Sequence, residues 1–538
     1  MKMPSSILLV AFCLILATGG TSARSAAEPE PSASVHRPNI VLVLTDDQDL
    51  LLGSLEFMPL LQARMADQGM TFSNFFVSQS LCCPSRVTLL RGQYTHNHKV
   101  FNNLPPDGGF EKAYALGLEN ATFATALQGA GYRTTLIGKY LNGYPLASNP
   151  TYIPPGWDEW FAPTTNSAYG SYNYTVNDDG VLVTYGGQRE DYITDVLTRE
   201  AISFITRTTT QAPTVPFFVA LNFYAPHGPA VPAPRHYNLF PNARAPRTPS
   251  FNEADMSDKP GFMQDYPPLT VDEILAIDRD YRKRLQSLQA VDQGIDALVT
   301  TLQFVGQLDN TYIVFASDNG YHMGQHRMLQ GKATPYEEDI RVPLIVRGPG
   351  VPAGSVRRAM TSMVDLAPTF ADIAGAVLPV TPDGRSLLPL LHNVSPVPPW
   401  RQMTLVEDYF PTSHAGFDIG GSWEPPDPFD NQAAQFNQPI QPTQPAQPAP
   451  MYSALRTPGY IYIRRSATLH ELYDLVNDPF QLQNQWENAS PSFRSQLDAK
   501  LAAYRTCVGA SCQTAGAGPP PTYMLNLYRR QFLPQVNR

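Results

Sequence analysis

The chain has 538 residues, of which 43% are apolar and 16% are charged, and its formal net charge is −9. A chain of this length can bury a sizeable core, and the composition suits one large α/β domain with a smaller companion. The charge is mildly acidic and the sequence has no dense basic stripe, so we expect no nucleic-acid partner.

The N-terminus has the pattern of a secretory signal peptide, which we place at residues 1–27. Lys2 precedes an apolar run over residues 7–17, and small residues follow up to Ala23. The run is short for a membrane span and no later segment is long and apolar enough, so we expect no span after signal removal. The mature protein is then exported, whether extracellular, periplasmic or lysosome-like. Four tripeptides match the N-glycosylation pattern, at Asn120, Asn173, Asn393 and Asn488.

Cysteine usage fits an exported protein. Cys13 lies in the signal run, and Cys507 and Cys512 are close enough in sequence to form a disulfide across the short loop between them. Cys82 and Cys83 then stay unpaired, because neighbouring cysteines close a disulfide only through a strained ring.

The first predicted strand of the mature chain covers residues 39–44, a continuous apolar and β-branched run. Such a run is typical of a strand buried on both faces, as in a parallel sheet. It leads into Asp46 and Asp47, at the end where open α/β sheets bind ligands. Adjacent carboxylates repel each other, so a divalent cation between them is a natural solution. The alternative is a solvated acidic loop.

Residues 80–86 read Ser-Leu-Cys-Cys-Pro-Ser-Arg. Pro84 suits the first turn of a helix, and Arg86 then lies about one turn beyond Cys82 on the same face. A nucleophile at a helix N-terminus beside a guanidinium is suited to a tetrahedral oxyanion. The C-x-P-x-R spacing resembles the signature of type I, formylglycine-dependent sulfatases of the alkaline-phosphatase-like superfamily. The alternative is a buried cysteine pair in a core helix.

The next predicted strand, residues 132–137, leads to Lys139. The segment 138–143 resembles the second sulfatase signature, which implies that Lys139 binds the sulfate. Many sulfatases have a histidine two residues later, where this chain has Leu141, so Asn142 or His98 is expected to replace part of that role. This segment and the His-Asn-His run at 96–98 are similar to glucosamine-6-sulfatases.

Another buried strand is predicted at residues 216–223 and leads to His227. A further strand at residues 311–317 leads to Asp318 and Asn319. The family has an Asp-Asn or Asp-His pair at the latter position that supplies metal ligands, and Lys332 matches its second sulfate-binding lysine. His326 is a tentative substrate contact. His322 and His326 are four apart, which suits a zinc pair on a helix, but the neighbouring glycines disfavour a regular helix.

The remaining segments complete the predicted architecture. Residues 145–187 are rich in Tyr, Asn, Gly and Pro and are predicted to form long loops, whereas residues 274–302 form an amphipathic helix with a solvated charged face. We predict an α/β fold, with a large mixed, mostly parallel sheet sandwiched by helices and a smaller C-terminal antiparallel sheet with a helix. The catalytic domain covers residues 36–398 and the C-terminal subdomain 399–538, with a Pro/Gln-rich loop at 424–450.

The resemblance implies a specific site. A maturation enzyme, the formylglycine-generating enzyme, oxidises Cys82 to Cα-formylglycine, and the expected cation is Ca²⁺, with Mg²⁺ as an alternative. The hydrated aldehyde attacks sulfur, Asp318 acts as base, His227 or Lys332 protonates the leaving oxygen, and sulfate is then eliminated. The implied metal ligands are Asp46, Asp47, residue 82, Asp318 and Asn319, and the implied catalytic residues are Cys82, Arg86, Lys139, His227, Asp318 and Lys332.

The expected activity is hydrolysis of sulfate monoesters, of the arylsulfatase or N-acetylglucosamine-6-sulfatase type. Two alternatives remain open. A phosphonate or phosphate ester hydrolase of the same superfamily can share the metal site, and a non-catalytic sulfated-glycan binder would keep Cys82 unmodified.

Overall fold

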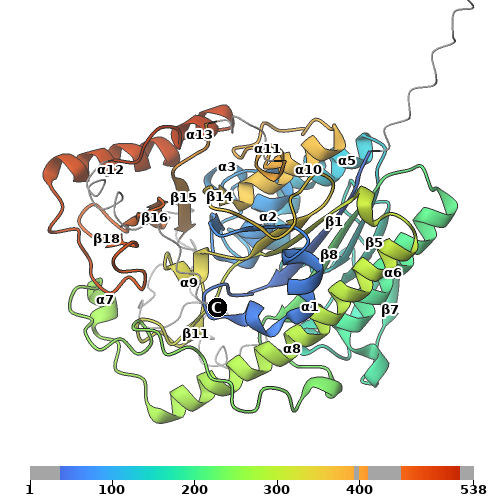
Figure 1. The fold of residues 1–538 in the computed structure, drawn as a ribbon, viewed down its shortest axis with the longest axis horizontal. Helices are drawn as coiled ribbons and strands as arrows, with labels where there is room; N and C mark the ends of the chain where they lie inside the picture. Colours follow the sequence, from blue (N-terminus) through green and yellow to red (C-terminus); the bar gives the residue numbers. More distant parts are fainter. Residues whose placement is uncertain (1–36, 393–398, 410–449, 522–538) are drawn as a thin grey trace, which may run out of the picture. The chain divides into compact units, whose positions relative to one another are not determined.

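The four predicted strands that lead to candidate site residues lie side by side in one large sheet (Figure 1). The computed structural model describes residues 37–392, 399–409 and 450–521. Ten strands hydrogen-bond in the order β13-β2-β12-β9-β1-β8-β4-β5-β6-β7, and β9, β1, β8, β4 and β5 are mutually parallel. Their bounds are β13 (Ser355–Arg357), β2 (Met70–Phe72), β12 (Leu344–Arg347), β9 (Thr311–Ser317), β1 (Asn39–Asp46), β8 (Phe217–Pro226), β4 (Arg133–Gly138), β5 (Glu159–Pro163), β6 (Thr175–Asp178) and β7 (Val181–Thr184).

Alternate residues of β1 enter two separate hydrophobic cores, as expected for a strand covered on both faces. Ile40, Leu42 and Leu44 pack with residues of α2 (Cys82–Arg91), α5 (Phe123–Gly129) and α10 (Leu366–Ala374). Val41 and Val43 pack with residues of α6 (Ile193–Gln211) and α8 (Val271–Phe304), which also contact each other. The sheet is therefore sandwiched by helices, and the predicted fold class is confirmed.

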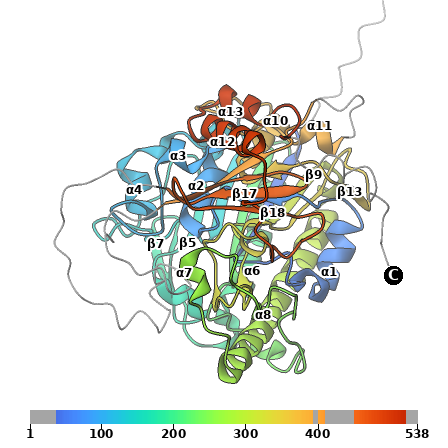
Figure 2. The ribbon, with the colours of Figure 1, turned by 90° about the vertical axis from the view of Figure 1, so that its left-hand side faces the viewer.

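A second sheet of four antiparallel strands lies near the C-terminus. It contains β15 (Thr404–Tyr409), β16 (Pro450–Arg456), β17 (Tyr460–Arg464) and β18 (His470–Asp474) in sequential order. The helix α12 (Pro491–Arg505) packs on it through Phe493, Leu497 and Leu501, and α13 (Ala510–Ala515) follows. Figure 2 shows this sheet with the two helices. The predicted C-terminal sheet and helix are present, while the boundary at 398/399 stays a prediction.

The prediction of long loops over residues 145–187 is wrong in part, because this segment supplies β5, β6 and β7. A tight turn joins β6 to β7, with Asp179 at φ 45° and Gly180 at φ 90°. An Asp-Gly pair at positive φ is typical of two-residue hairpins. The high content of Gly, Asn and Pro around the hairpin concealed its short strands.

The other elements are short. They are α1 (Pro59–Leu61), β3 (Phe75–Phe76), α3 (Thr95–His98), α4 (Gly109–Ala115), α7 (Gly261–Gln264), β10 (His322–Met323), β11 (Gln330–Gly331), α9 (Glu337–Ile340), β14 (Thr361–Ser362) and α11 (Leu388–Leu391).

Several predictions bear on export. Among the described residues, no helix has the length and apolarity needed to span a bilayer. The predicted signal peptide, the acceptor Asn393 and residues 424–449 of the Pro/Gln-rich loop lie outside the described residues, whereas Asn120, Asn173 and Asn488 are exposed. The expected disulfide between Cys507 and Cys512 is present, and Cys82 and Cys83 are free and buried.

Candidate active site

Polar residues follow four neighbouring strands of the large sheet at their carboxyl ends. Asp46 ends β1 and Asp47 follows it, Lys139 follows β4, His227 follows β8, and Asp318 with Asn319 follows β9. All six side chains are buried. Because β1 lies between β8 and β9, and β4 lies beside β8, residues far apart in sequence meet at one edge of the sheet.

The backbone before Lys139 needs a glycine. Gly138 has φ +107°, and a Cβ atom there would lie 2.0 Å from the carbonyl oxygen of Asn222 on β8. The Lys139 carbonyl then accepts hydrogen bonds from Asn222 Nδ2 and Arg86 Nη1, both at 2.9 Å. The strand end is thereby fixed, and Lys139 Nζ lies 2.7 Å from Asp46 Oδ2.

The helix α2 brings Cys82 and Arg86 to the same place. Leu81 is extended and Cys82 is the first helical residue, so Cys82 and Arg86 share one face of the helix. Cys82 Sγ lies 3.5 Å from Asp46 Oδ1. Arg86 Nε donates to Asp318 Oδ2 at 2.8 Å. The sequence motif and the strand ends therefore form one cluster.

Lys332 completes this cluster from the strand β11, which directly precedes it. Its Nζ lies 2.6 Å from Asp47 Oδ1 and 2.9 Å from Cys82 Sγ. Asn319 Nδ2 donates to the same Asp47 oxygen at 2.6 Å, and His227 Nε2 lies 3.6 Å from Asp47 Oδ2. Three carboxylates, two lysines and an arginine thus surround the Cys82 thiol.

Burial raises the pKa values of the acidic groups in this cluster, whereas the neighbouring cationic side chains lower them. Burial alone would raise the pKa of Asp46, but Lys139, His227 and Arg86 lower it well below its usual range. Burial raises the pKa of Asp318 to about 6, with a further contribution from the Asp46 carboxylate. Burial also raises the pKa of the Cys82 thiol. The unmodified thiol is therefore protonated at neutral pH and a poor nucleophile.

The carboxylate and amide oxygens at the strand ends fit a hard divalent cation, whereas the Cys82 thiol and the His227 ring beside them are softer ligands. Asp46, Asp47, Cys82 and His227 each offer a ligand atom, and these atoms lie within 4.8 Å of one another. Asp47 Oδ2 and Asn319 Oδ1 are buried and, among the described residues, have no hydrogen-bond donor. Buried oxygens without a partner are costly, and oxygen ligands are those that Ca²⁺ and Mg²⁺ prefer.

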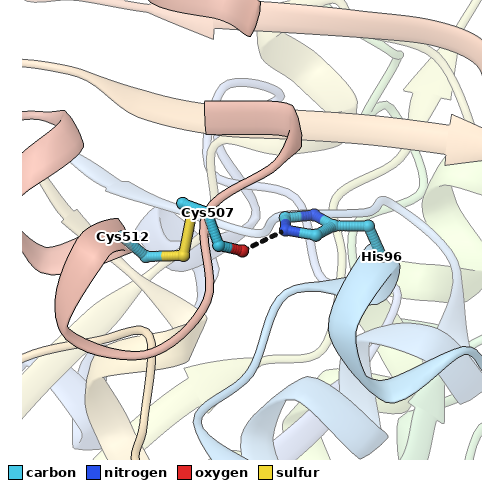
Figure 3. A group of neighbouring side chains, drawn as sticks. All are labelled: His96, Cys507 and Cys512. Atoms are coloured by element: carbon cyan, nitrogen blue, oxygen red, sulfur yellow. Dashed lines mark hydrogen bonds between the residues drawn. A yellow bond between two sulfur atoms is a disulfide. The ribbon is translucent and has the colours of Figure 1, made fainter. Parts of the chain in front are cut away.

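A second group with ligand-type atoms, His96 with Cys507 and Cys512, does not fit a metal (Figure 3). The two sulfurs form the disulfide, and a ring nitrogen of His96 lies 2.9 Å from the Cys507 carbonyl oxygen. The other ring nitrogen lies 2.9 Å from Glu407 Oε1. Nε2 thus holds the disulfide loop against α3 and Nδ1 binds Glu407 on β15, so both ring nitrogens are already used.

The tentative substrate residues are placed differently. His98 is buried and uses both ring nitrogens, with Thr88 at 3.1 Å and the Val100 amide at 3.1 Å. His326 Nδ1 is bonded to Glu253 Oε2 at 2.6 Å. Asn142 Oδ1 is buried without a hydrogen-bond partner among the described residues. Substrate-contact roles for these three residues stay predictions.

The zinc pair on a helix is not formed. His322 belongs to the strand β10 and His326 has φ 52°, which no regular helix allows. His322 Nδ1 instead lies 2.9 Å from Asp339 Oδ1.

Sequence reasoning missed Arg284 on α8, because the charged face of this helix was expected to be solvated. Arg284 is buried and donates to the Asp47 and Pro226 carbonyls. The signal was present in the sequence: Arg284 lies three residues after Tyr281 and four before Leu288, so it falls on the apolar face.

Comparison with known proteins agrees with this geometry. The family model described as Sulfatase matches residues 38–376. The human N-acetylglucosamine-6-sulfatase is 36% identical over 500 residues, which cover 91% of this chain and 88% of that protein. A putative extracellular sulfatase Sulf-1 homolog of Caenorhabditis elegans is 42% identical over 377 residues, or 69% of this chain. The chain spans only about half of that relative, 52% of its length.

Solved structures share the fold. A protein in complex with its substrate D-glucosamine-2-N,6-O-disulfate matches with a TM-score of 0.66 and 24% identity, over 87% of this chain and 97% of that one. The phosphonate monoester hydrolase of Agrobacterium radiobacter matches with a TM-score of 0.63 and 20% identity, over 87% and 95%. These likenesses concern the fold, whereas the family match and the identity to the human enzyme show that this chain belongs to the sulfatase family.

Proposed function

We propose that the chain hydrolyses sulfate monoesters, with residue 82 acting as formylglycine beside a divalent cation. One observation carries the proposal: Cys82 Sγ lies 3.5 Å from Asp46 Oδ1 and 2.9 Å from Lys332 Nζ, inside the charge cluster at the strand ends.

The cation is proposed to be Ca²⁺, with Mg²⁺ as the alternative. Asp46, Asp47, Asp318 and Asn319 would hold it, together with residue 82. Asp47 Oδ2 and Asn319 Oδ1, which accept no hydrogen bond from the described residues, support this assignment. When bound, the cation supplies positive charge for the sulfate oxygens, and the hydrated aldehyde supplies the attacking hydroxyl.

The cationic side chains are proposed to bind the sulfate. Arg86, Lys139 and Lys332 are fixed by ion pairs with the three carboxylates, so they are preorganised for an anion. A sulfate monoester repels ordinary nucleophiles, and these charges offset that repulsion. Asp318 is proposed as the base, and His227 or Lys332 as the acid for the leaving oxygen.

The substrate class is proposed from the relatives. Human and goat proteins named N-acetylglucosamine-6-sulfatase align over 91% and 89% of this chain, which favours a 6-sulfated amino sugar. A Volvox carteri arylsulfatase is 33% identical over 94% of the chain, so aryl sulfates are the alternative. Two relatives are named extracellular sulfatases, which supports export, and maturation would need a formylglycine-generating enzyme.

A phosphonate ester hydrolase is the second candidate, because the fold likeness to phosphonate monoester hydrolases is almost as high as that to the glucosamine-disulfate complex. Values of kcat/KM on matched aryl sulfate, aryl phosphonate and glucosamine 6-sulfate substrates separate the candidates. We expect sulfate esters to be preferred, and a preference for the phosphonate would refute the proposed function.

The same assay tests the role of residue 82. Cys82→Ser and Cys82→Ala should lose nearly all turnover, whereas Cys83→Ala, a matched change at the neighbouring buried cysteine, should keep most of it. Wild-type protein that binds sulfated sugar without turnover would favour the non-catalytic binder.

A further inference from the structure

Arg284 connects the helix layer to the candidate site. It lies on α8 and its residue surface is only 4% exposed. Its two terminal nitrogens donate to two carbonyls, Nη2 to that of Asp47 and Nη1 to that of Pro226 at 3.2 Å. The centre of its guanidinium also lies 4.3 Å from the centroid of the Tyr321 ring.

These three contacts reach the ends of three neighbouring strands. Asp47 follows β1, Pro226 ends β8, and Tyr321 comes shortly after β9. Each of these segments carries a residue of the site, namely Asp47 itself, His227 and Asn319. The guanidinium of Arg284 therefore contacts all three strand ends. Each of these strand ends carries a proposed cation ligand or the proposed acid.

The backbone conformation of Asp47 is one that needs stabilising contacts. Its φ is 64°, a left-handed conformation that residues other than glycine rarely adopt. Its N–H donates to Asp318 Oδ1 at 3.1 Å, while its carbonyl accepts from Arg284. The conformation is thus fixed from both sides, and it decides where the Asp47 carboxylate points.

The charge of Arg284 is offset locally. Asp49 Oδ1 lies 3.6 Å from Arg284 Nη2 and is itself buried. The guanidinium can therefore hold the Asp47 carbonyl without adding an unbalanced positive charge close to a cation site.

We propose that Arg284 is a positioning residue for the cation: it holds Asp47 in its left-handed turn, so that the carboxylate is aimed at the metal before the metal binds. The inference rests on the proposed function, because that supplies the cation. A lysine cannot replace Arg284, since one ammonium group does not match the fork that reaches two carbonyls.

The test compares Arg284→Lys and Arg284→Met with Arg282→Met. Arg282 lies on the same helix and donates to the Ala243 carbonyl at 3.1 Å, away from the strand ends, so it is a matched control. Amide hydrogen exchange of residues 47–49 is measured in EDTA, and calcium affinity is measured by titration calorimetry. Neither readout depends on turnover.

We expect Arg284→Lys to exchange these amides faster than wild type and to bind calcium about 10 to 100-fold more weakly, the loss typical of partners that orient metal ligands. Arg282→Met should match wild type in both measurements. Should Arg284→Met fail to fold, the lysine variant decides.

Wild-type exchange and affinity in Arg284→Lys would overturn the inference. A failure of the proposed cation site looks different: wild-type protein would bind neither Ca²⁺ nor Mg²⁺. That result would show that Arg284 does not position a metal ligand. The exchange rates would still show whether Arg284 holds the turn at Asp47.

Discussion

Two sets of buried charges can be compared in this chain, one at the carboxyl ends of the central strands and one between the two sheets. Between the sheets, Arg456 makes a bidentate pair with Glu337 at 2.6 and 2.9 Å, and His96 pairs with Glu407 at 2.9 Å. None of these four side chains has a buried polar atom without a partner in the described residues.

At the strand ends the situation differs. Asp47 Oδ2, Asn319 Oδ1 and Arg86 Nη2 are buried and lack hydrogen-bond partners among the described residues. Native proteins satisfy most of their buried polar groups, and single atoms without a partner in the described part of the chain also occur in the second sheet, as at Asp408 Oδ2 and Tyr452 Oη. Three such atoms within one cluster of opposite charges favour a place for a ligand. The charges between the sheets hold the fold together, whereas those at the strand ends form the proposed site for a cation and an anion.

The largest expected effect comes from removing a proposed ligand. Asp47→Asn keeps the shape of the side chain but removes a negative charge, so Lys332 loses the anionic partner of its 2.6 Å ion pair. We expect kcat/KM on the sulfate ester to fall by more than about 100-fold and calcium to lose its stabilising effect on thermal unfolding. A variant that calcium still stabilises as it does wild type would contradict the metal assignment.

Breaking a pair between the sheets should affect stability alone. Arg456→Met removes the bidentate partner of the buried Glu337 carboxylate and leaves Arg341, at 3.7 Å, as its only ion-pair partner among the described residues. We therefore expect a loss of about 3 kcal/mol in the free energy of urea unfolding. Arg456 lowers the pKa of Glu337 against the effect of burial, so this loss is complete above pH 4.5 and shrinks as pH falls through the lowered pKa.

Two controls sharpen that result. Arg64→Met removes an exposed partner of Asp296 and should cost below about 1 kcal/mol. The kcat of folded Arg456→Met should equal that of wild type, and a large drop in kcat would mean that the two sets of charges are not separate.

The smallest effect concerns His96 and depends on pH. Burial opposes protonation of His96, but Glu407 outweighs it and raises its pKa above 6.5, whereas His96 lowers the pKa of Glu407 below 4.5. The stabilisation is present below pH 6.5 and lost as pH rises through the raised pKa. It is also lost as pH falls through the pKa of Glu407.

We therefore expect His96→Gln to cost about 1 to 2 kcal/mol near pH 5.5 and less above pH 8, measured by urea unfolding. His236 is a control of opposite sign, because burial lowers its pKa, so His236→Gln should gain stability relative to wild type as pH falls. A pH-independent loss in His96→Gln would show that its charge is not involved.

Much of the sheet and its strand ends could be predicted from the sequence, because β1, β8 and β9 are largely apolar runs, each followed by polar residues. The rules of parallel sheets then bring Asp46, His227 and Asp318 to one edge. The hairpin of β6 and β7 was missed because Gly and Asn around it resemble loop composition, although Asp179-Gly180 is a hairpin signal.

Arg284 shows the other limit of sequence reasoning. A charged residue on an amphipathic helix is usually solvated, and only the three-dimensional packing reveals that carbonyls of two strand ends lie within its reach. The role of His98 stays a prediction: the sequence places it near a family motif, and in the structure Thr88 and Val100 contact its two ring nitrogens.

The most direct test of the central claim is the mass of the tryptic peptide from Met65 to Arg86 in active wild-type protein, after alkylation of free thiols. We predict one alkylated cysteine, Cys83, and at position 82 the mass decrease that accompanies conversion of a thiol side chain to an aldehyde. A fully active enzyme in which both cysteines of this peptide are alkylated would contradict the account.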